Sequence, residues 1–135
     1  MSTRPVPKFV SLNTEKELIN LISISDDSVV ILDYHQDWSG PTQAIMPFLN
    51  QLWMEIDDCE KRIYLAACTT DVPGSQKLVQ SWAGADVKVA AQGCKPLFIV
   101  LRQGQAVGSV DGLNTPVLRM LIDLYLPKLQ KKTEE

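Results

Sequence analysis

A polar segment between two hydrophobic stretches holds most of the side chains that could take part in chemistry. It runs from Asp33 to Thr42 and has the sequence Asp-Tyr-His-Gln-Asp-Trp-Ser-Gly-Pro-Thr. Ser39 could act as a nucleophile if His35, four residues before it, removed its proton. His35 is the only histidine of the chain, and nothing in the sequence marks an oxyanion hole. The residues therefore do not favour a hydrolase, and we expect His35 to be a partly exposed side chain at the surface of this segment.

The three cysteines, Cys59, Cys68 and Cys94, lie far apart, and no two of them have Cys-x-x-Cys spacing. With a single histidine in the chain they form no metal-ligand pattern, so we expect no metal and no cofactor. Their small, odd number also argues against a secreted disulfide scaffold. One alternative stays open, in which Cys94 is a lone reactive thiol that forms a mixed disulfide with a partner.

Composition excludes several classes of protein. The chain has 135 residues, of which 45% are hydrophobic and 21% charged, a globular balance, and a net charge of −3 gives no basic surface for nucleic acid or an anionic membrane. No apolar run approaches the roughly 18 residues of a spanning helix, and Met1–Lys8 lacks the apolar core of a signal peptide. We expect a soluble, cytoplasmic protein with one domain, 1–130, and a polar tail, 131–135.

Hydrophobic stretches alternate with helical patterns, and the order β-α-β-α-β-α-β-β-α predicts a mixed α/β sheet with helices on both faces. The last helix, expected over Val117–Leu129 with Asn114 or Thr115 as its cap, has few polar residues, which fits either packing on the sheet or a partner surface. Pro47 is expected to bend the helix in which it lies. The expected strands are Phe9–Leu12, Val29–Leu32, Arg62–Cys68, Leu97–Leu101 and Ala106–Val110, and the expected earlier helices follow Asn13 or Thr14, run from Pro41 to Asp57, and run from Pro73 to Ala83.

The segment from Asp33 to Thr42 resembles the active-site turn of the thioredoxins, in which a strand ending in a buried Asp leads to Trp-Cys-Gly-Pro-Cys. Asp33 stands five residues before Trp38, as in that family. The resemblance extends over nearly the whole chain and implies the thioredoxin fold, a central mixed sheet of about five strands flanked by helices on both faces. Further matches to the family pattern are the Pro47 helix kink, the Pro73-Gly74 helix start, Lys95-Pro96 at the cis-proline position, and the spacing of Gly104 and Gly112.

The two family cysteines are absent, because Ser39 and Thr42 stand at their positions. Dithiol chemistry needs two thiols within disulfide reach, and neither hydroxyl can form a disulfide. The resemblance therefore implies a thioredoxin scaffold that is not an enzyme. Asp33 would be a retained buried acid with no thiol to serve.

Two short segments resemble the axonemal thioredoxins more closely, namely the thioredoxin light chains of outer-arm dynein and the thioredoxin domains fused to nucleoside diphosphate kinase modules. These segments are Cys94-Lys95-Pro96-Leu97-Phe98 and Gly112-Leu113-Asn114-Thr115-Pro116. The resemblance implies a non-catalytic docking subunit of a ciliary or flagellar axoneme, whose protein partners include dynein or other axonemal subunits. Thioredoxins hold an extended peptide in a groove, which would here involve Trp38, Gly40, Pro41, Lys95 and Pro96.

Other functions remain open at this point. A monothiol oxidoreductase would act through Cys94, and a general folding helper would bind unfolded chains in the same groove. The segment before Pro96 is longer than in ordinary thioredoxins, and the extra residues lie around Trp82–Gln92. An insertion beside the groove would be a natural contact for a partner.

Overall fold

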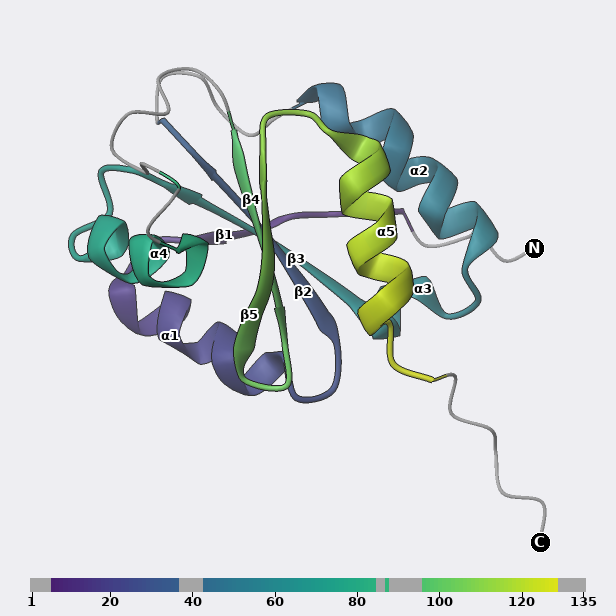
Figure 1. Ribbon diagram of the computed structural model, residues 1–135, viewed down its shortest axis with the longest axis horizontal. Coiled ribbons are helices and arrows are strands. Elements are labelled where there is room, and N and C mark those ends of the chain that lie inside the picture. The colour runs from purple at the N-terminus through teal and green to yellow at the C-terminus, as the bar shows by residue number, and fades with distance from the viewer. Residues whose placement is uncertain (1–5, 37–42, 85–86, 88–95, 129–135) are drawn as a thin grey trace, which may run out of the picture.

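Strands and helices alternate along the chain, as the hydrophobic pattern predicts. The computed structural model describes residues 6–36, 43–84, 87 and 96–128 (Figure 1). The elements are β1 Val10–Leu12, α1 Glu15–Ile24, β2 Val29–His35, the 3-10 turn η2 Gln43–Ile45, α2 Met46–Glu55, α3 Cys59–Arg62, β3 Ile63–Thr69, α4 Ser75–Ala83, β4 Leu97–Arg102, β5 Gln105–Asp111 and α5 Thr115–Tyr125.

The five strands form one mixed sheet in the order β1-β3-β2-β4-β5, which confirms the predicted fold class. β1 and β2 both pair in parallel with β3, whereas β4 pairs antiparallel with β2 and with β5. β2 lies at the centre, and all seven of its residues are buried. A continuous run of branched apolar residues such as Val29–Leu32 is typical of a strand that is covered on both faces.

Helices cover both faces of the sheet, with α1 and α4 on one side and α2 and α5 on the other (Figure 1). Each side has its own hydrophobic core. The α1/α4 core includes Leu18, Leu21 and Val79, and the α2/α5 core includes Leu49, Leu52 and Leu118. Burial of apolar side chains in these two layers is the main force that holds the helices on the sheet.

The helix caps settle two alternatives left open by the sequence. Thr14, not Asn13, caps α1: its hydroxyl accepts from the Glu17 backbone N–H at 3.1 Å, and the Glu17 carboxylate accepts from the Thr14 N–H at 3.2 Å. This reciprocal pair is a capping box. Asn114 caps α5, where its side-chain oxygen accepts from the Val117 N–H at 3.4 Å.

Two prolines account for differences between the helices and the sequence prediction. Pro47 was expected to bend a helix interior, but it lies in the first turn of α2, where a missing N–H costs nothing. The helix predicted to continue to Leu129 ends at Tyr125, because Pro127 disfavours helical backbone at Leu126, whose ψ is 127°. The short helix α3 was not predicted from the sequence.

Two arginines hold the C-terminal end of α5, which has no basic residue in its own last turn. Arg102 donates from Nε to the Tyr125 carbonyl at 3.0 Å. Arg62 donates from Nε and Nη2 to the Pro127 carbonyl at 3.0 and 2.9 Å. These guanidinium groups provide donors and positive charge where the helix leaves carbonyls without partners.

Candidate functional site

Asp33 and His35 lie two residues apart on β2, so their side chains point to the same face of the sheet. Asp33 is completely buried, as the sequence predicts, and the His35 Nδ1 lies 3.5 Å from its Oδ1 and 3.4 Å from its backbone oxygen. His35 was expected to be partly exposed, but only 4% of it is accessible. This prediction is wrong, because the imidazole of His35 packs inward against Asp33.

The end of β2 and the start of β4 lie side by side. Tyr34 pairs with Leu97, so Pro96 follows one residue beyond this pair, at the level of His35. The Pro96 carbonyl accepts from the Gly112 N–H at 2.9 Å, which ties the start of β4 to the end of β5. Of the residues predicted to bind a partner, Pro96 is thus placed beside the end of β2.

The remaining predicted site residues fall outside the described part of the chain. This applies to Trp38, Ser39, Gly40, Pro41 and Thr42, and also to Cys94 and Lys95, so that the Lys95–Pro96 peptide bond is outside it as well. In the segment from Trp82 to Gln92, α4 ends at Ala83 and the Gln80 amide donates to the carbonyls of Gly84 and Val87 at 2.8 and 2.5 Å.

The two cysteines in the described part of the chain are buried. Cys59 begins α3 and Cys68 lies in β3, and each is 1% exposed. Burial in apolar surroundings raises the pKa of each thiol to about 12. Because the thiolate is the nucleophile and the metal ligand, neither side chain is suited to redox chemistry. Among the residues that the structure describes, no group of three or more His, Cys, Asp or Glu side chains could hold a metal ion.

The outer face of α5 carries exposed apolar side chains. Met120 and Leu124, one helical turn apart, are 53% and 67% exposed, whereas Leu118 and Ile122 on the inner face are buried. Beside them, Arg119 donates to the Glu55 carboxylate of α2 at 2.8 Å and to Asp123 at 3.1 Å. We call Met120 and Leu124 the α5 surface.

Over the described ranges, no helix has the length and hydrophobicity to cross a membrane.

Comparison with known proteins identifies the architecture. No protein-family model matches the chain. It is similar to thioredoxin of Mus musculus, with 29% identity over 104 residues, covering 77% of this chain and 86% of that protein. The crystal structure of thioredoxin NaTrxh from Nicotiana alata superposes on this chain with a TM-score of 0.61 at 16% sequence identity, covering 94% of this chain and all of that one. The chain therefore has the thioredoxin fold.

Two further relatives extend the comparison. The flagellar outer-arm dynein 16 kDa light chain of Chlamydomonas reinhardtii is 20% identical over 116 residues, which is 86% of this chain and 67% of that protein. The thioredoxin domain-containing protein 3 homolog of Heliocidaris crassispina is 26% identical over 130 residues, covering 92% of this chain but only 14% of that protein. Sequences similar to this chain thus occur both in thioredoxins and in a dynein subunit.

Proposed function

We propose that this chain is a non-enzymatic docking subunit with a thioredoxin fold, which works in a ciliary or flagellar axonemal complex associated with dynein or with the doublet. One observation carries the proposal: the first 58 residues contain no cysteine. A thioredoxin exchanges electrons through two thiols between β2 and α2, and Ser39 and Thr42 at those positions supply only hydroxyls. Similarity to the Chlamydomonas dynein light chain supports the axonemal setting.

In this proposal the former active-site groove grips a partner. Trp38, Gly40, Pro41, Lys95 and Pro96 would hold an extended segment, with its backbone pairing beside the proline as an added strand. The pairing of β2 with β4 supports this grouping, since it brings Pro96 to the end of β2 from which the turn departs. Without disulfide exchange, only non-covalent contacts hold the complex together.

The α5 surface supplies a second contact. Met120 and Leu124 lie at the i, i+4 spacing with which a helix presents an apolar stripe to another helix or a groove. The ion pairs of Arg119 with Glu55 and Asp123 provide a polar rim beside this stripe. An apolar centre with a polar rim is typical of protein interfaces.

The test is the distribution of the tagged chain in detergent-extracted axonemes of a flagellate. We expect wild type to stay with the axoneme and Leu124→Asp to move into the soluble fraction. The matched control is Asn50→Asp, which adds the same charge at an exposed position of neighbouring α2 and should stay bound. A wild-type chain found wholly as a free monomer in the detergent extract would contradict the proposal.

Monothiol oxidoreductase activity is the second candidate. Burial of Cys59 and Cys68 favours Cys94 as the thiol that would carry it. Insulin reduction and mixed-disulfide trapping, with Cys94→Ser as control, separate the two functions. We expect no turnover by wild type, and turnover that the substitution abolishes would overturn the non-enzymatic assignment. A general folding helper would instead bind many unfolded clients without a fixed stoichiometry.

A further inference from the structure

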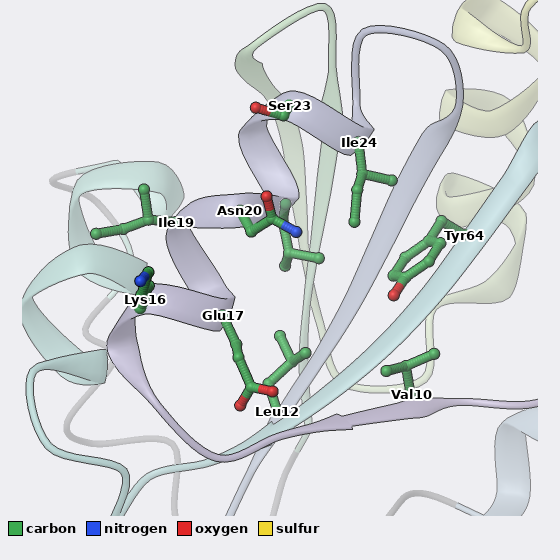
Figure 2. A pocket seen from close by; sticks show the side chains of 10 residues that line it. Val10, Leu12, Lys16, Glu17, Ile19, Asn20, Ser23, Ile24 and Tyr64 are labelled. Carbon is green, nitrogen blue, oxygen red and sulfur yellow. The ribbon is translucent and has the colours of Figure 1, made fainter.

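Exposed apolar side chains lie on both sides of the sheet. On the α1 side, Figure 2 shows Val10 and Ile24 beside a groove of about 510 Å³ between β1 and α1. The two charged residues that line this groove, Lys16 and Glu17, have opposite signs, and the Glu17 carboxylate already caps α1. The groove therefore favours neither an anionic nor a cationic occupant, whereas the charges around α5 follow a definite pattern.

On the outer side of α5, apolar side chains have the spacing of a helix–helix contact. The α5 surface, Met120 and Leu124, follows the partly buried Val117 at steps of three and four residues. Leu113, four residues before Val117 and just ahead of the helix cap, is 45% exposed and extends the same stripe. Alternating steps of three and four residues are the spacing at which two α-helices pack side by side. The stripe therefore fits a partner helix.

The two ends of this stripe have opposite charge. Asp111 is exposed shortly before the start of α5, and Lys128 is exposed just beyond its end. Neither side chain makes a salt bridge in the described part of the chain. Arg62 and Arg102, which bind carbonyls at the end of α5, add to the positive charge there. A second copy placed antiparallel brings each acidic end to a basic end, whereas a parallel copy would bring the basic ends together.

Arg119 has donors that its own chain does not use. Its Nε donates to Asp123 and its Nη1 to Glu55, whereas its Nη2 donates to no group among the described residues. Asp123 lies one turn after Arg119, on the flank of the stripe that faces α2, and is 56% exposed. A guanidinium group presents five N–H donors, so Arg119 can bind a further carboxylate beside this flank.

We infer that the α5 surface binds the same surface of a second copy, as an antiparallel pair of α5 helices related by a twofold axis. The axis passes through the middle of the stripe, between Met120 and Leu121. Arg119 of one copy then lies level with the partner's Ile122, one residue from the partner's Asp123. A twofold axis perpendicular to the helices puts like flanks side by side, so the Nη2 of each Arg119 donates to the partner's Asp123.

The interface is small. α5 has 11 residues and is about 16 Å long, so one pair of these helices buries less area than a standard interface. We therefore expect a weak dimer, with a dissociation constant of roughly 0.1 mM. A dimer of this kind rests on the docking role proposed for the α5 surface, but not on an axonemal setting.

Sedimentation equilibrium of the full chain tests the dimer from about 10 µM to 1 mM, in a reducing buffer that keeps Cys94 from linking two copies. We expect wild type to dimerise reversibly. Met120→Asp should weaken the dimer at least about tenfold, because apolar contact is lost and two carboxylates meet near the twofold axis.

The matched control is Ile19→Asp. Ile19 is 48% and Met120 53% exposed, and α1 lies on the opposite side of the sheet from α5 (Figure 1). The affinity of this variant for itself should stay within about twofold of wild type. Thermal melting checks that both variants fold.

Two charge variants, Arg119→Asp and Asp123→Arg, test the contact between the copies. Alone, each places like charges side by side across the twofold axis and should dimerise about three- to thirtyfold more weakly than wild type at low salt. When the two variants are mixed, opposite charges meet at both cross-contacts. Their mixed dimer should reach an affinity within about threefold of wild type.

Several results would overturn the inference: a wild-type chain that stays monomeric at about 1 mM, equal losses for Met120→Asp and Ile19→Asp, or a mixture of the charge variants that stays monomeric. Retention of a monomeric chain in axonemes would place a different protein on the α5 surface, which overturns the dimer and leaves the docking role in place. Dimers that wash out of axonemes would support the inference and contradict the axonemal assignment alone.

Discussion

Gly108 of β5 faces the Leu121 side chain of α5, and its replacement by alanine tests how closely the helix packs on the strand. An added Cβ would lie 2.7 Å from Cδ1 and 2.9 Å from Cδ2 of Leu121, which is 8% exposed. Ordinary contacts between carbon atoms are about 3.5–4.0 Å. Gly108→Ala therefore requires Leu121, or the helix that carries it, to move by about 1 Å.

Overpacking of this kind costs about 1–3 kcal/mol. For a chain of this size, about 4 °C in melting temperature corresponds to 1 kcal/mol, so we expect a fall of about 4–12 °C. Leu121→Ala alone removes buried methyl groups and should cost about 2–5 kcal/mol. In the double variant the new methyl group occupies part of the space that Leu121 leaves. Its loss should be smaller than the sum of the two single losses by about 1–3 kcal/mol.

Urea unfolding followed by circular dichroism gives the free energy of unfolding for all four proteins of this cycle. The reasoning fails if Gly108→Ala is as stable as wild type. It also fails if the two losses add, because additivity would mean that the new methyl group and Leu121 do not meet. A changed dependence on urea in one variant would show altered compactness, and that variant would then be compared by melting temperature alone.

Three other predictions concern the thiols, the helix cap and the surface ion pair. At pH 8, Cys59 and Cys68 of the native Cys94→Ser chain should react with a thiol reagent about a thousandfold more slowly than an exposed thiol, since their pKa is raised to about 12, and both should react at once in urea; fast labelling of this native variant would refute the prediction. Thr14→Ala should lower the free energy of unfolding by about 1 kcal/mol in urea titrations, and an unchanged midpoint would mean that the capping box is not formed. The hydrogen bond from Arg119 lowers the pKa of Glu55, so the pair contributes stability above the unfolded pKa and loses it as the pH falls through the lowered pKa. Glu55→Gln should therefore melt below wild type at pH 7 in low salt and together with it in acid, whereas a difference that persists in acid would count against the pair.

The sheet was predictable because its central strands carry strong local signals. Val29–Leu32 is a continuous run of branched and apolar residues, and Gln103-Gly104 supplies the turn between β4 and β5. The end of α5 was predicted too late in the chain. Pro127 is a helix-breaking residue, but the apolar pattern continues past it to Leu129 and favoured a longer helix. The position of Pro47 was ambiguous, because proline is compatible with a first turn and with a bend.

The candidate site was only partly accessible to sequence reasoning. Burial of Asp33 followed from the resemblance, whereas burial of His35 depends on β2 continuing three residues beyond its apolar run, so that the two side chains share one face. The pairing of β1 with β3 was beyond sequence reasoning, because it depends on the register between the two strands. Three residues of β1 contain no periodicity from which such a register could be derived.

The arginine contacts at the end of α5 have a practical consequence for measuring how this protein sits in a larger assembly. Arg62 binds the carbonyl of Pro127 and Arg102 that of Tyr125, so the backbone before Lys128 is held by the last residues of α3 and β4. A spin label or fluorophore at Lys128 would therefore inherit little motion from the backbone that carries it. Distances measured from that label would report the placement of the whole domain.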